Sequence, residues 1–518
     1  MIGSFWAFMP AIVAIVLALL TKQVYVSLFV GILTGALMFA EGNPLRALGT
    51  LYSVMSEKVG ENVPIVVFLV ILGIFVVLMQ KSGGSRAYGN WAETKIKSKS
   101  GALAATAGLG CLIFVDDYFN CLTVGSVMRP VTDKFKISHS KLAWIIDSTA
   151  APVCIIAPIS SWAAAVSGQL EGNGLVVFIK TIPFNVYAIL TIIMVFAFSY
   201  MQLDFGKMKR NEICAIESGD LNAGEVDLPT EADSTIVENP KGKVRHLIVP
   251  VIILIACCVG GMIYSGFFYN WDTYTYGTEV QSANVLEAFA NCDAGSSLAI
   301  GSTIALFIVA AYYIIDKVVS FKEITDSITQ GFKAMVPAIL ILTFAWSISG
   351  IMGAKGGYLD AKAFVSENMA MIPATVKALF PAIFFLLASA IAFSTGTSWG
   401  TFGVLVPIAV TILGGEGTLV LITVSATLGG AVFGDHVSPI SDTTILASTG
   451  GNCNHVDHVK TQLPYAALIA GIAFLSYIVA GLLASVGSVV SALVMWVAAL
   501  ALFAGAVFAI KYLQKKKA

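Results

Sequence analysis

Two aspartates and a histidine lie within eight residues of an otherwise apolar stretch, FGDHVSPISDTTILAS, at 433–448. Asp435 and Asp442 supply carboxylate oxygens, and His436 supplies an imidazole that acts either as a proton carrier or as a hydrogen-bonding scaffold. A carboxylate in apolar surroundings is costly unless it is paired, hydrated or protonated, so these residues mark a candidate functional site. A hard cation such as Na⁺ prefers oxygen ligands and competes for them with protons. We therefore predict a Na⁺ site at Asp435 and Asp442.

Three further aspartates lie in apolar segments that are interrupted by Gly, Pro, Ser and Thr. Asp116 and Asp117 belong to FVDDYFN, where Asn120 adds an amide oxygen, and Asp147 lies in IIDSTAAP. Burial beside a like charge lets a carboxylate hold a proton near neutral pH. Proton and cation then exclude each other on one group. We expect these residues at the cation and proton site, although Asp147 is equally well explained as a hydrogen-bonded structural acid.

Hydroxyl side chains follow the same interruptions in the sequence. We expect them to complete a cation shell or to cap short helices. They are Ser160, Ser161, Thr397, Ser398, Ser438, Ser441 and Thr443. In SPISDTT, Ser438 is predicted as the N-cap, with Pro439 at the first helical position. The segment 157–161, APISS, is predicted to start a second half-helix from the opposite side.

The composition describes a membrane protein rather than a soluble one. Of 518 residues, 57% are hydrophobic and 12% are charged, and the net charge is −1, which gives no electrostatic footprint for nucleic acid. The eight cysteines form no CxxC pair. The opening segment lacks a basic start and a small-residue cleavage site, so it is predicted to be a spanning helix rather than a signal peptide.

Apolar runs long enough to cross a bilayer recur along the chain, since about 20 residues suffice for a helix. They lie at 5–21, 24–41, 61–80, 174–200, 246–267, 297–315, 335–353, 462–484 and 486–512. Two longer regions, 101–165 and 375–448, are too broken for simple helices and predict interrupted helices and a re-entrant hairpin. The segment CNHVDH, at 453–458, is predicted to be a loop, with a metal site there disfavoured.

The two halves of the sequence resemble each other. Pro64 and Pro337 share one offset (337 − 64 = 273) with the glycines Gly84 and Gly357 (357 − 84 = 273). FVDDYFN aligns with FSTGTSW, and IAPISSW aligns with HVSPISD. These matches in order predict an internal repeat.

The helix breaks are repeated but the acids are not. The alignment places Asp116 and Asp117 opposite Thr395 and Gly396. It places Cys154 and Ser161 opposite the acids of the second half, Asp435 and Asp442. We therefore expect one composite site rather than two equivalent ones.

Basic residues give the orientation. The loop 81–100, the segment 201–245 and the C-terminal QKKKA are rich in Lys and Arg and should be cytoplasmic, whereas 268–296 has neither and should be external. This arrangement predicts repeats of inverted topology, which with broken helices are typical of secondary transporters that bind substrate at the midplane.

The predicted fold is therefore an all-α polytopic membrane protein with two inverted-topology repeats, each with a discontinuous crossover helix and a re-entrant or broken-helix hairpin. The predicted segments are a first transmembrane helix (1–23), repeat 1 (24–200), a flexible cytoplasmic linker (201–245), a linking transmembrane helix and external loop (246–296), repeat 2 (297–484) and a C-terminal transmembrane helix with a basic tail (485–518).

The stretches GDHVSPISDTTILAS, FVDDYFN and DSTAAPVCIIAPISSW together resemble the NhaC-type Na⁺/H⁺ antiporter family over nearly the whole chain. The resemblance implies exchange of Na⁺ or Li⁺ for H⁺. The residues that match the family motif are Asp435, His436, Ser438, Asp442 and Thr443. Carriers of malate, lactate or amino acids are also similar, so the resemblance leaves the substrate open.

These observations predict a multi-pass antiporter of the bacterial inner membrane rather than an enzyme. Its transported ions are Na⁺ and H⁺, with no other cofactor, and its expected partners are the lipid bilayer and a second copy of the chain. The alternative is a cation- or proton-coupled carrier of a small organic anion or amino acid. An intramembrane aspartyl hydrolase, with two aspartates activating water, is disfavoured because no substrate-docking domain accompanies the repeats.

Overall fold

The computed structural model describes residues 2–21, 23–170, 173–224, 239–270, 275–277, 280–285, 287–288, 292–352, 358–368, 372–415 and 417–517. Within these ranges, nine helices are long and apolar enough to cross a membrane. The predicted all-α polytopic membrane fold is confirmed. Gly357, one member of the predicted repeat, lies outside the described residues.

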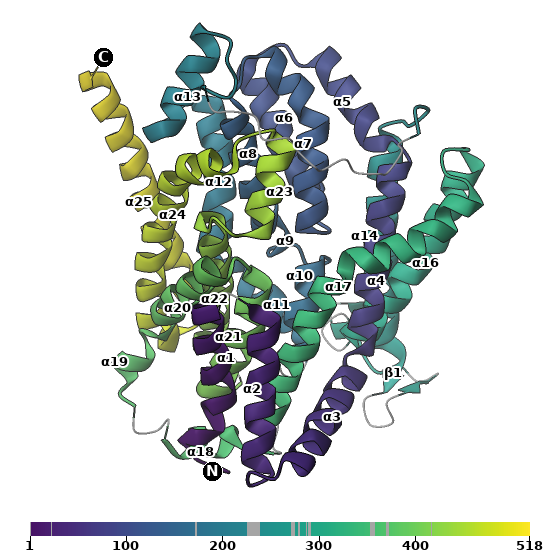
Figure 1. Cartoon of the computed structure of the whole chain (residues 1–518), viewed down its shortest axis with the longest axis vertical. Helices are drawn as coiled ribbons and strands as arrows, with labels where there is room; N and C mark the ends of the chain where they lie inside the picture. Colours follow the sequence, from purple (N-terminus) through teal and green to yellow (C-terminus); the bar gives the residue numbers. More distant parts are fainter. Residues whose placement is uncertain are drawn as a thin grey trace.

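Helices account for the structure of the first half of the chain (Figure 1). Their bounds are η1 (Phe5–Phe8), α1 (Met9–Thr21), α2 (Val24–Phe39), α3 (Pro44–Glu61), α4 (Val63–Lys81), α5 (Gly84–Lys95), α6 (Lys99–Leu112), α7 (Asp117–Lys134), α8 (His139–Thr149), α9 (Ala151–Cys154), α10 (Ser161–Ser167), α11 (Gly174–Thr181), η2 (Ile182–Phe184) and α12 (Val186–Met201). The run predicted at 174–200 is therefore interrupted: Pro183 lies in η2, and the Asn185 side chain caps α12.

The rest of the chain adds helices and one short hairpin of two-residue strands. Their bounds are α13 (Gly206–Glu217), α14 (Arg245–Phe268), β1 (Tyr269–Asn270), β2 (Thr275–Tyr276), α16 (Ala294–Ile315), α17 (Phe321–Met352), α18 (Ala361–Asn368), α19 (Ala374–Lys377), α20 (Phe380–Thr395), α21 (Ser398–Leu413), α22 (Thr418–Val437), α23 (Asp442–Gly451), α24 (His455–Leu482), η4 (Ala484–Val486) and α25 (Ser488–Lys517). In the most apolar part of α22, 78% of residues are buried, against 17% in α25, so α22 lies in the interior and α25 at the periphery.

The segments rich in Lys and Arg that were predicted to be cytoplasmic lie at one end of the molecule. Figure 1 shows α5, α13 and the C-terminus at one end, and α3, α18 and β1 at the other. The segments predicted to be cytoplasmic thus share one end. The predicted offset of 273 residues pairs the first residue of α3 with residue 317 (44 + 273 = 317), just before α17. Helix α17 begins near the basic end, whereas α3 lies at the opposite end. The inverted relation of the repeats, and the segment boundaries derived from it, stay predictions.

Four helices begin inside the molecule after a break, and the side chain of the residue just before each helix caps it. Asp116 and Thr397 cap α7 and α21, and Ser160 and Ser441 cap α10 and α23. Each side-chain oxygen accepts a backbone N–H three residues further on. Both pairs of caps have the same offset (397 − 116 = 281 and 441 − 160 = 281).

This offset corrects two predictions. The cap Asp116 corresponds to Thr397, so Thr395 is not its counterpart, and the predicted alignment was wrong by two residues at this break. The prediction that Ser438 is an N-cap was also wrong. Ser438 ends α22, and its hydroxyl donates to the carbonyl oxygen of Phe393 at 2.7 Å, which leaves Ser441 to cap α23.

The segment predicted as a flexible linker is partly a docked helix. Helix α13 lies against the first turns of α8 and α24: the Asn211 amide donates to Ser140 Oγ at 3.0 Å and to Asp457 Oδ2 at 2.7 Å. Glu212 accepts the backbone N–H of Ser138 at 2.8 Å, and Lys207 pairs with Asp457. The prediction of flexibility was therefore wrong for 206–217.

Replacing Asn211 with Ala should loosen α13 from the bundle. The loss of two buried hydrogen bonds costs about 1.4 kcal/mol or more, so the backbone amides of α13 should exchange with deuterium about tenfold faster. Mass spectrometry of hydrogen exchange measures this. Lys209→Ala changes an exposed residue of the same helix and is the matched control; equal exchange in the two variants would contradict the docking.

Candidate functional site

Two of the capped helices, one from each half of the chain, run side by side in register. Gly125 of α7 packs on Gly450 of α23 so closely that a Cβ on Gly125 would lie 2.4 Å from the Gly450 backbone. Each glycine is eight residues beyond the first residue of its helix (125 − 117 = 8 and 450 − 442 = 8). The first residues, Asp117 and Asp442, therefore lie at the same level.

Asp442 is held by both helices. Its Oδ2 accepts the phenol O–H of Tyr118 at 2.6 Å, and its Oδ1 accepts the backbone N–H of Thr443 at 2.9 Å. The Thr443 hydroxyl donates to Oδ2 of Asp435 at the end of α22. Thr443 thus joins the two predicted cation ligands, one through its backbone and one through its side chain, and the structure brings Asp435 and Asp442 together as predicted.

Asp116 and Asp117 have different roles. Asp116 Oδ1 accepts the backbone N–H of Phe119 at 3.0 Å, so this acid caps α7. Asp117 is fully buried; its Oδ2 accepts the indole N–H of Trp162 at 3.1 Å, while its Oδ1 has no hydrogen-bond partner. Asp117 is also within electrostatic range of Asp442. Asp117 therefore belongs to the cluster at the α7 and α23 ends, and Asp116 supports it.

Asn120 stabilises the break before α7. Its amide nitrogen lies 2.7, 2.9 and 3.0 Å from the carbonyl oxygens of Gly110, Ile113 and Thr149. Carbonyls at a helix end lack intrahelical donors, and one side chain supplies them here. Its own oxygen, Oδ1, is buried without a partner and stays available to a ligand.

Asp147 and His436 lie in a second group next to the first. Asp147 Oδ2 accepts the amide of Gln462 at 2.6 Å, the hydroxyl of Thr444 at 3.2 Å and Nε2 of His458 at 3.3 Å. His436 is not a direct partner of Asp435: its Nδ1 contacts the Tyr187 hydroxyl at 2.9 Å. Asp147 and His436 thus lie next to the Asp435–Asp442 pair without forming a hydrogen bond to either carboxylate.

Of the hydroxyl residues predicted to cap helices or complete a cation shell, some cap helices and others lie near the acids. Ser160, Ser441 and Thr397 cap their helices, and Ser438 closes the break between α22 and α23. The Ser161 hydroxyl is buried without a partner, while its backbone N–H donates to the Val115 carbonyl at 2.9 Å. Ser398, the first residue of α21, is buried. The Thr443 hydroxyl contacts Asp435, and the Ser441 hydroxyl lies 3.2 Å from that of Thr443.

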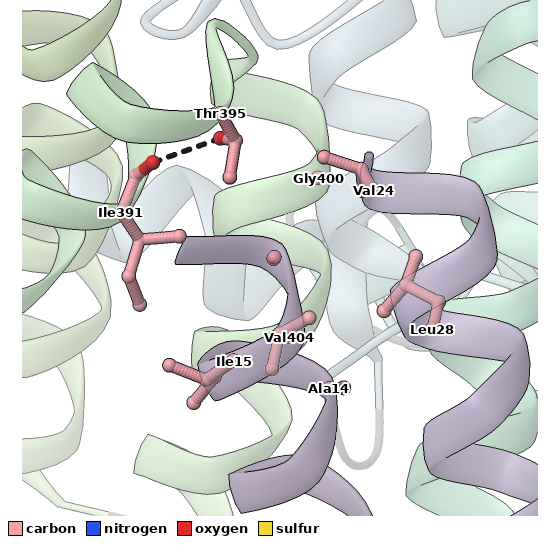
Figure 2. Close-up of a pocket in the computed structure, with 9 residues that line it drawn as sticks. Ala14, Ile15, Val24, Leu28, Ile391, Thr395, Gly400 and Val404 are labelled. Atoms are coloured by element: carbon pink, nitrogen blue, oxygen red, sulfur yellow. Dashed lines mark hydrogen bonds between the residues drawn. The ribbon is translucent and has the colours of Figure 1, made fainter. Parts of the chain in front are cut away.

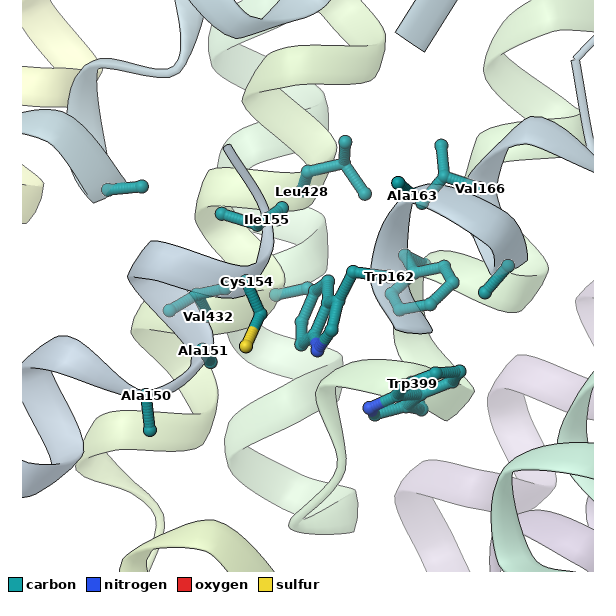
Figure 3. Close-up of a cluster of buried hydrophobic side chains, with 14 of the residues drawn as sticks. Ala150, Ala151, Cys154, Ile155, Trp162, Ala163, Val166, Trp399, Leu428 and Val432 are labelled. Atoms are coloured by element: carbon teal, nitrogen blue, oxygen red, sulfur yellow. The ribbon is translucent and has the colours of Figure 1, made fainter. Parts of the chain in front are cut away.

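The neighbourhood of Asp117 is aromatic and apolar. Trp162 of α10 and Trp399 of α21 have ring centroids 5.7 Å apart, and Figure 3 shows them beside Cys154 and the small residues Ala150 and Ala151. The Trp399 indole nitrogen is buried without a partner. The cluster therefore excludes water from one side of the acids.

A separate small pocket lies between α1, α2, α20 and α21 (Figure 2). Its lining is Ala14, Ile15, Ala18, Val24, Leu28, Ile391, Thr395, Gly400 and Val404. The Thr395 hydroxyl there already donates to the Ile391 carbonyl at 2.8 Å. This pocket offers no charged or unbonded polar group and is no part of the acidic site.

Buried oxygens without donors gather around the acids. They are Asp117 Oδ1, Asn120 Oδ1, Asp147 Oδ1, Asp435 Oδ1 and Gln462 Oε1. Within the described ranges, the five aspartates make no ion pair with lysine or arginine, and Asp147 pairs with His458 alone. The same ranges hold no cluster of three or more His, Cys, Asp or Glu side chains suited to a metal ion. Hydroxyl and amide oxygens would have to complete a cation shell here.

Sequence reasoning missed Tyr118, His458 and Gln462. The segment 453–458 was predicted to be a loop, but α24 begins at His455 and its first turn separates the side chains. His455 contacts the Pro439 carbonyl at 2.8 Å, Asp457 faces α13, and His458 faces Asp147. The i, i+4 spacing of His458 and Gln462 places both on one face of a helix, but this spacing does not identify Asp147 as their partner.

The chain matches known transporters. A model described as the Na⁺/H⁺ antiporter family matches residues 173–482, more than half of the chain. The chain belongs to the Na⁺/H⁺ antiporter family. The resemblance seen in the sequence is confirmed, and the protein is a multi-pass membrane transporter rather than an enzyme. It is a secondary antiporter of a cation or solute; a homodimer stays a prediction.

Individual relatives give the range of substrates in similar proteins. An uncharacterised protein of Haemophilus influenzae is 40% identical over 498 residues, which cover 92% of this chain and 91% of that one. A malate-2H(+)/Na(+)-lactate antiporter of Bacillus subtilis is 31% identical over 28% of this chain and 30% of its own. An arginine/ornithine antiporter of Halobacterium salinarum is 38% identical over 21% and 23%. The YdaH transporter of Alcanivorax borkumensis aligns with a TM-score of 0.48 at 13% identity over 89% of this chain and 98% of its own, too weak a likeness for an argument.

Removing the Thr443 hydroxyl should destabilise the site. Thr443→Val leaves a buried oxygen of Asp435 without its donor, so the free energy of unfolding should fall by about 1–3 kcal/mol, whereas Thr443→Ser keeps the donor and should stay near wild type. Unfolding by SDS in mixed micelles measures this.

The matched control is Thr423→Val, because the Thr423 hydroxyl donates only to the Leu419 carbonyl of its own helix. If Thr443→Val and Thr423→Val lower the free energy of unfolding equally, the Thr443 hydroxyl does not support Asp435 in the way described.

Proposed function

We propose that this protein exchanges Na⁺ for H⁺ across the bacterial cytoplasmic membrane and binds the cation where α7 and α23 begin. The observation that carries the proposal is that three acceptor oxygens, Asp117 Oδ1, Asn120 Oδ1 and Asp435 Oδ1, are buried without donors. A carboxylate or amide oxygen accepts hydrogen bonds but does not donate them, so leaving several together without donors is costly. A bound cation offsets this cost directly.

The chemistry of these oxygens favours a hard monovalent cation. Carboxylate, amide and hydroxyl groups are hard ligands, and the breaks add backbone carbonyls nearby. Asp435 and Asp442 supply the charge, and Asp117 and Asn120 contribute from the other half of the chain. The alignment of α7 with α23 is what brings the two halves of the ligand set together.

The same absence of lysine and arginine partners explains why protons compete with the cation. A bare carboxylate buried without a countercharge is far less stable than one carrying a proton or a metal ion. The beginnings of α7 and α23 carry partial positive charge, which offsets only part of the negative charge of Asp117 and Asp442. A carrier that opens this site to each side in turn exchanges one ion for the other.

An organic substrate is the second candidate, and one observation favours it. The unpartnered indole N–H of Trp399 is a donor that a cation site does not need, and it lies in the aromatic cluster with Trp162 next to Asp117. A donor beside an acid and an aromatic face suits an amino acid or a small carboxylate. Two relatives named for such solutes share part of their sequence with this chain.

Removing the charge at Asp442 should abolish exchange. In proteoliposomes with an imposed pH gradient, adding NaCl should dissipate the gradient through the wild type but not through Asp442→Asn or Asp435→Asn, because each amide is neutral and neither takes up nor releases the coupling proton. Asp326→Asn, which changes an exposed aspartate of α17, is the control. Wild-type exchange in Asp442→Asn protein would contradict the assignment.

The response to different cations distinguishes Na⁺ exchange from transport of an organic solute. KCl and choline chloride should give no response, and LiCl should give a response like that of NaCl. Silence with every inorganic cation, from protein shown to be inserted and folded, would contradict Na⁺ exchange. Saturable uptake of labelled arginine, ornithine, malate or lactate by the same protein would then support the organic candidate.

A further inference from the structure

A buried group of polar residues lies beside the cation cluster and shares none of its ligand oxygens. It consists of Asp147 on α8, His458 and Gln462 on α24, and His436 at the end of α22. All four are at most 1% exposed. Gln462 bridges the group, because its amide nitrogen lies 2.6 Å from Asp147 Oδ2 and 2.8 Å from the His436 carbonyl oxygen.

Four atoms of this group are buried without a hydrogen-bond partner. They are Asp147 Oδ1, His458 Nδ1, His436 Nε2 and Gln462 Oε1. A carboxylate oxygen binds a proton, and an imidazole nitrogen either binds or releases one. A purely structural acid and histidine would use these atoms in hydrogen bonds, since buried polar atoms are normally satisfied. The group therefore has unoccupied positions that can hold protons.

The charged and titratable neighbours come from every element packed around the group. Asp435 and Asp442 face it from α22 and α23, with Tyr187 from α12 and Cys121 from α7. Asp457, next to His458 on α24, is occupied by Lys207 and Asn211 of the linker. Among the described residues in hydrogen-bond contact with Asp147, none is a lysine or arginine. Among the described residues, His458 is therefore the only titratable side chain that donates to the Asp147 carboxylate.

Thr444 connects this group to the cation cluster. Its hydroxyl lies 3.2 Å from Asp147 Oδ2 and 3.2 Å from the backbone carbonyl of Asp435. A hydroxyl has one hydrogen, so it donates to one of these oxygens at a time. Protonation of Asp147 weakens it as an acceptor, which favours donation to Asp435. Thr444 is in the first turn of α23, so the change reaches the turn that holds Asp442.

We infer that Asp147 and His458 form a second proton-holding site, which takes up a proton during Na⁺/H⁺ exchange and is linked to the cation oxygens through Thr444. The inference rests on the proposed function. No bond other than that to the proton forms or breaks: the proton binds Asp147 Oδ1 or His458 Nδ1 and leaves by the same atom. The pair is needed when protons move and dispensable when Na⁺ exchanges for Na⁺.

The test separates proton movement from cation binding. Proteoliposomes carrying the purified protein and a trapped pH dye are assayed in two ways, for uptake of ²²Na⁺ in exchange for internal Na⁺ and for protons moved per ²²Na⁺ under a pH gradient. His458→Gln keeps an amide donor in reach of Asp147 but has no titratable group. In this variant Na⁺/Na⁺ exchange should be retained, whereas the number of protons moved per Na⁺ should fall and lose its dependence on pH.

Asp147→Asn is the second variant and should behave in the same way. His455→Gln, three residues earlier on α24, is the matched control, because His455 contacts the Pro439 carbonyl and Ser448 rather than Asp147. Its proton-to-Na⁺ ratio should equal that of the wild type.

The outcomes distinguish this inference from the proposed function. Absence of Na⁺/Na⁺ exchange in the folded wild type overturns the proposed function and the inference with it. Wild-type Na⁺/Na⁺ exchange that is lost in folded His458→Gln overturns the inference alone, because the histidine then belongs to the cation site. An unchanged proton-to-Na⁺ ratio in both His458→Gln and Asp147→Asn also overturns it.

Discussion

The constraint on which the rest of this structure depends is the cost of placing several carboxylates in apolar surroundings without a lysine or arginine to balance them. The chain offsets part of this cost with neighbouring hydrogen-bond donors: a phenol donates to Asp442, a threonine hydroxyl to Asp435 and an indole to Asp117. Each of these donors satisfies one oxygen of its acid. The remaining oxygens of Asp117 and Asp435 have no donor, and we interpret them as the place for an ion that comes and goes.

The helix breaks make this arrangement of acids possible. A continuous helix would use its backbone groups internally and present only side chains, whereas a break places the beginning of a new helix at the same depth as the acids. Caps at a constant offset of 281 residues set two such starts in each half (397 − 116 = 281 and 441 − 160 = 281). The Gly125–Gly450 contact then joins a start from one half to a start from the other. Gly396 adds a second constraint: its left-handed backbone (φ 68°) packs on the Ile440 carbonyl, which leaves no room for a side chain.

Much of this arrangement could be predicted from the sequence. Apolar runs predict spanning helices, basic loops predict the orientation, and aspartates in apolar segments predict a functional site. The acids and most of the caps were identified in this way. The N-cap was misplaced because SPISD offers two serines, and a proline after the first imitates a helix start. Only the tertiary contact of Ser438 with the Phe393 carbonyl decides between them.

Other features depend on contacts between distant segments and could not be predicted from the sequence. The polar linker gave no local sign of packing, yet Met208 and Asn211 of α13 are buried against the bundle. His458 and Gln462 became visible as partners of Asp147 only when α24 proved to begin at His455. Tyr118 follows two aspartates, and its bond to Asp442 spans 324 residues of sequence.

The most direct test of the central claim is the release of protons when Na⁺ binds to purified protein. Na⁺ is added to detergent-solubilised protein in weakly buffered solution, with a pH dye as the readout and choline as the control cation. Competition for the same buried carboxylates predicts proton release on addition of Na⁺, with a Na⁺ affinity that falls as the pH is lowered. Binding of Na⁺ without proton release, at an affinity independent of pH, would contradict the account.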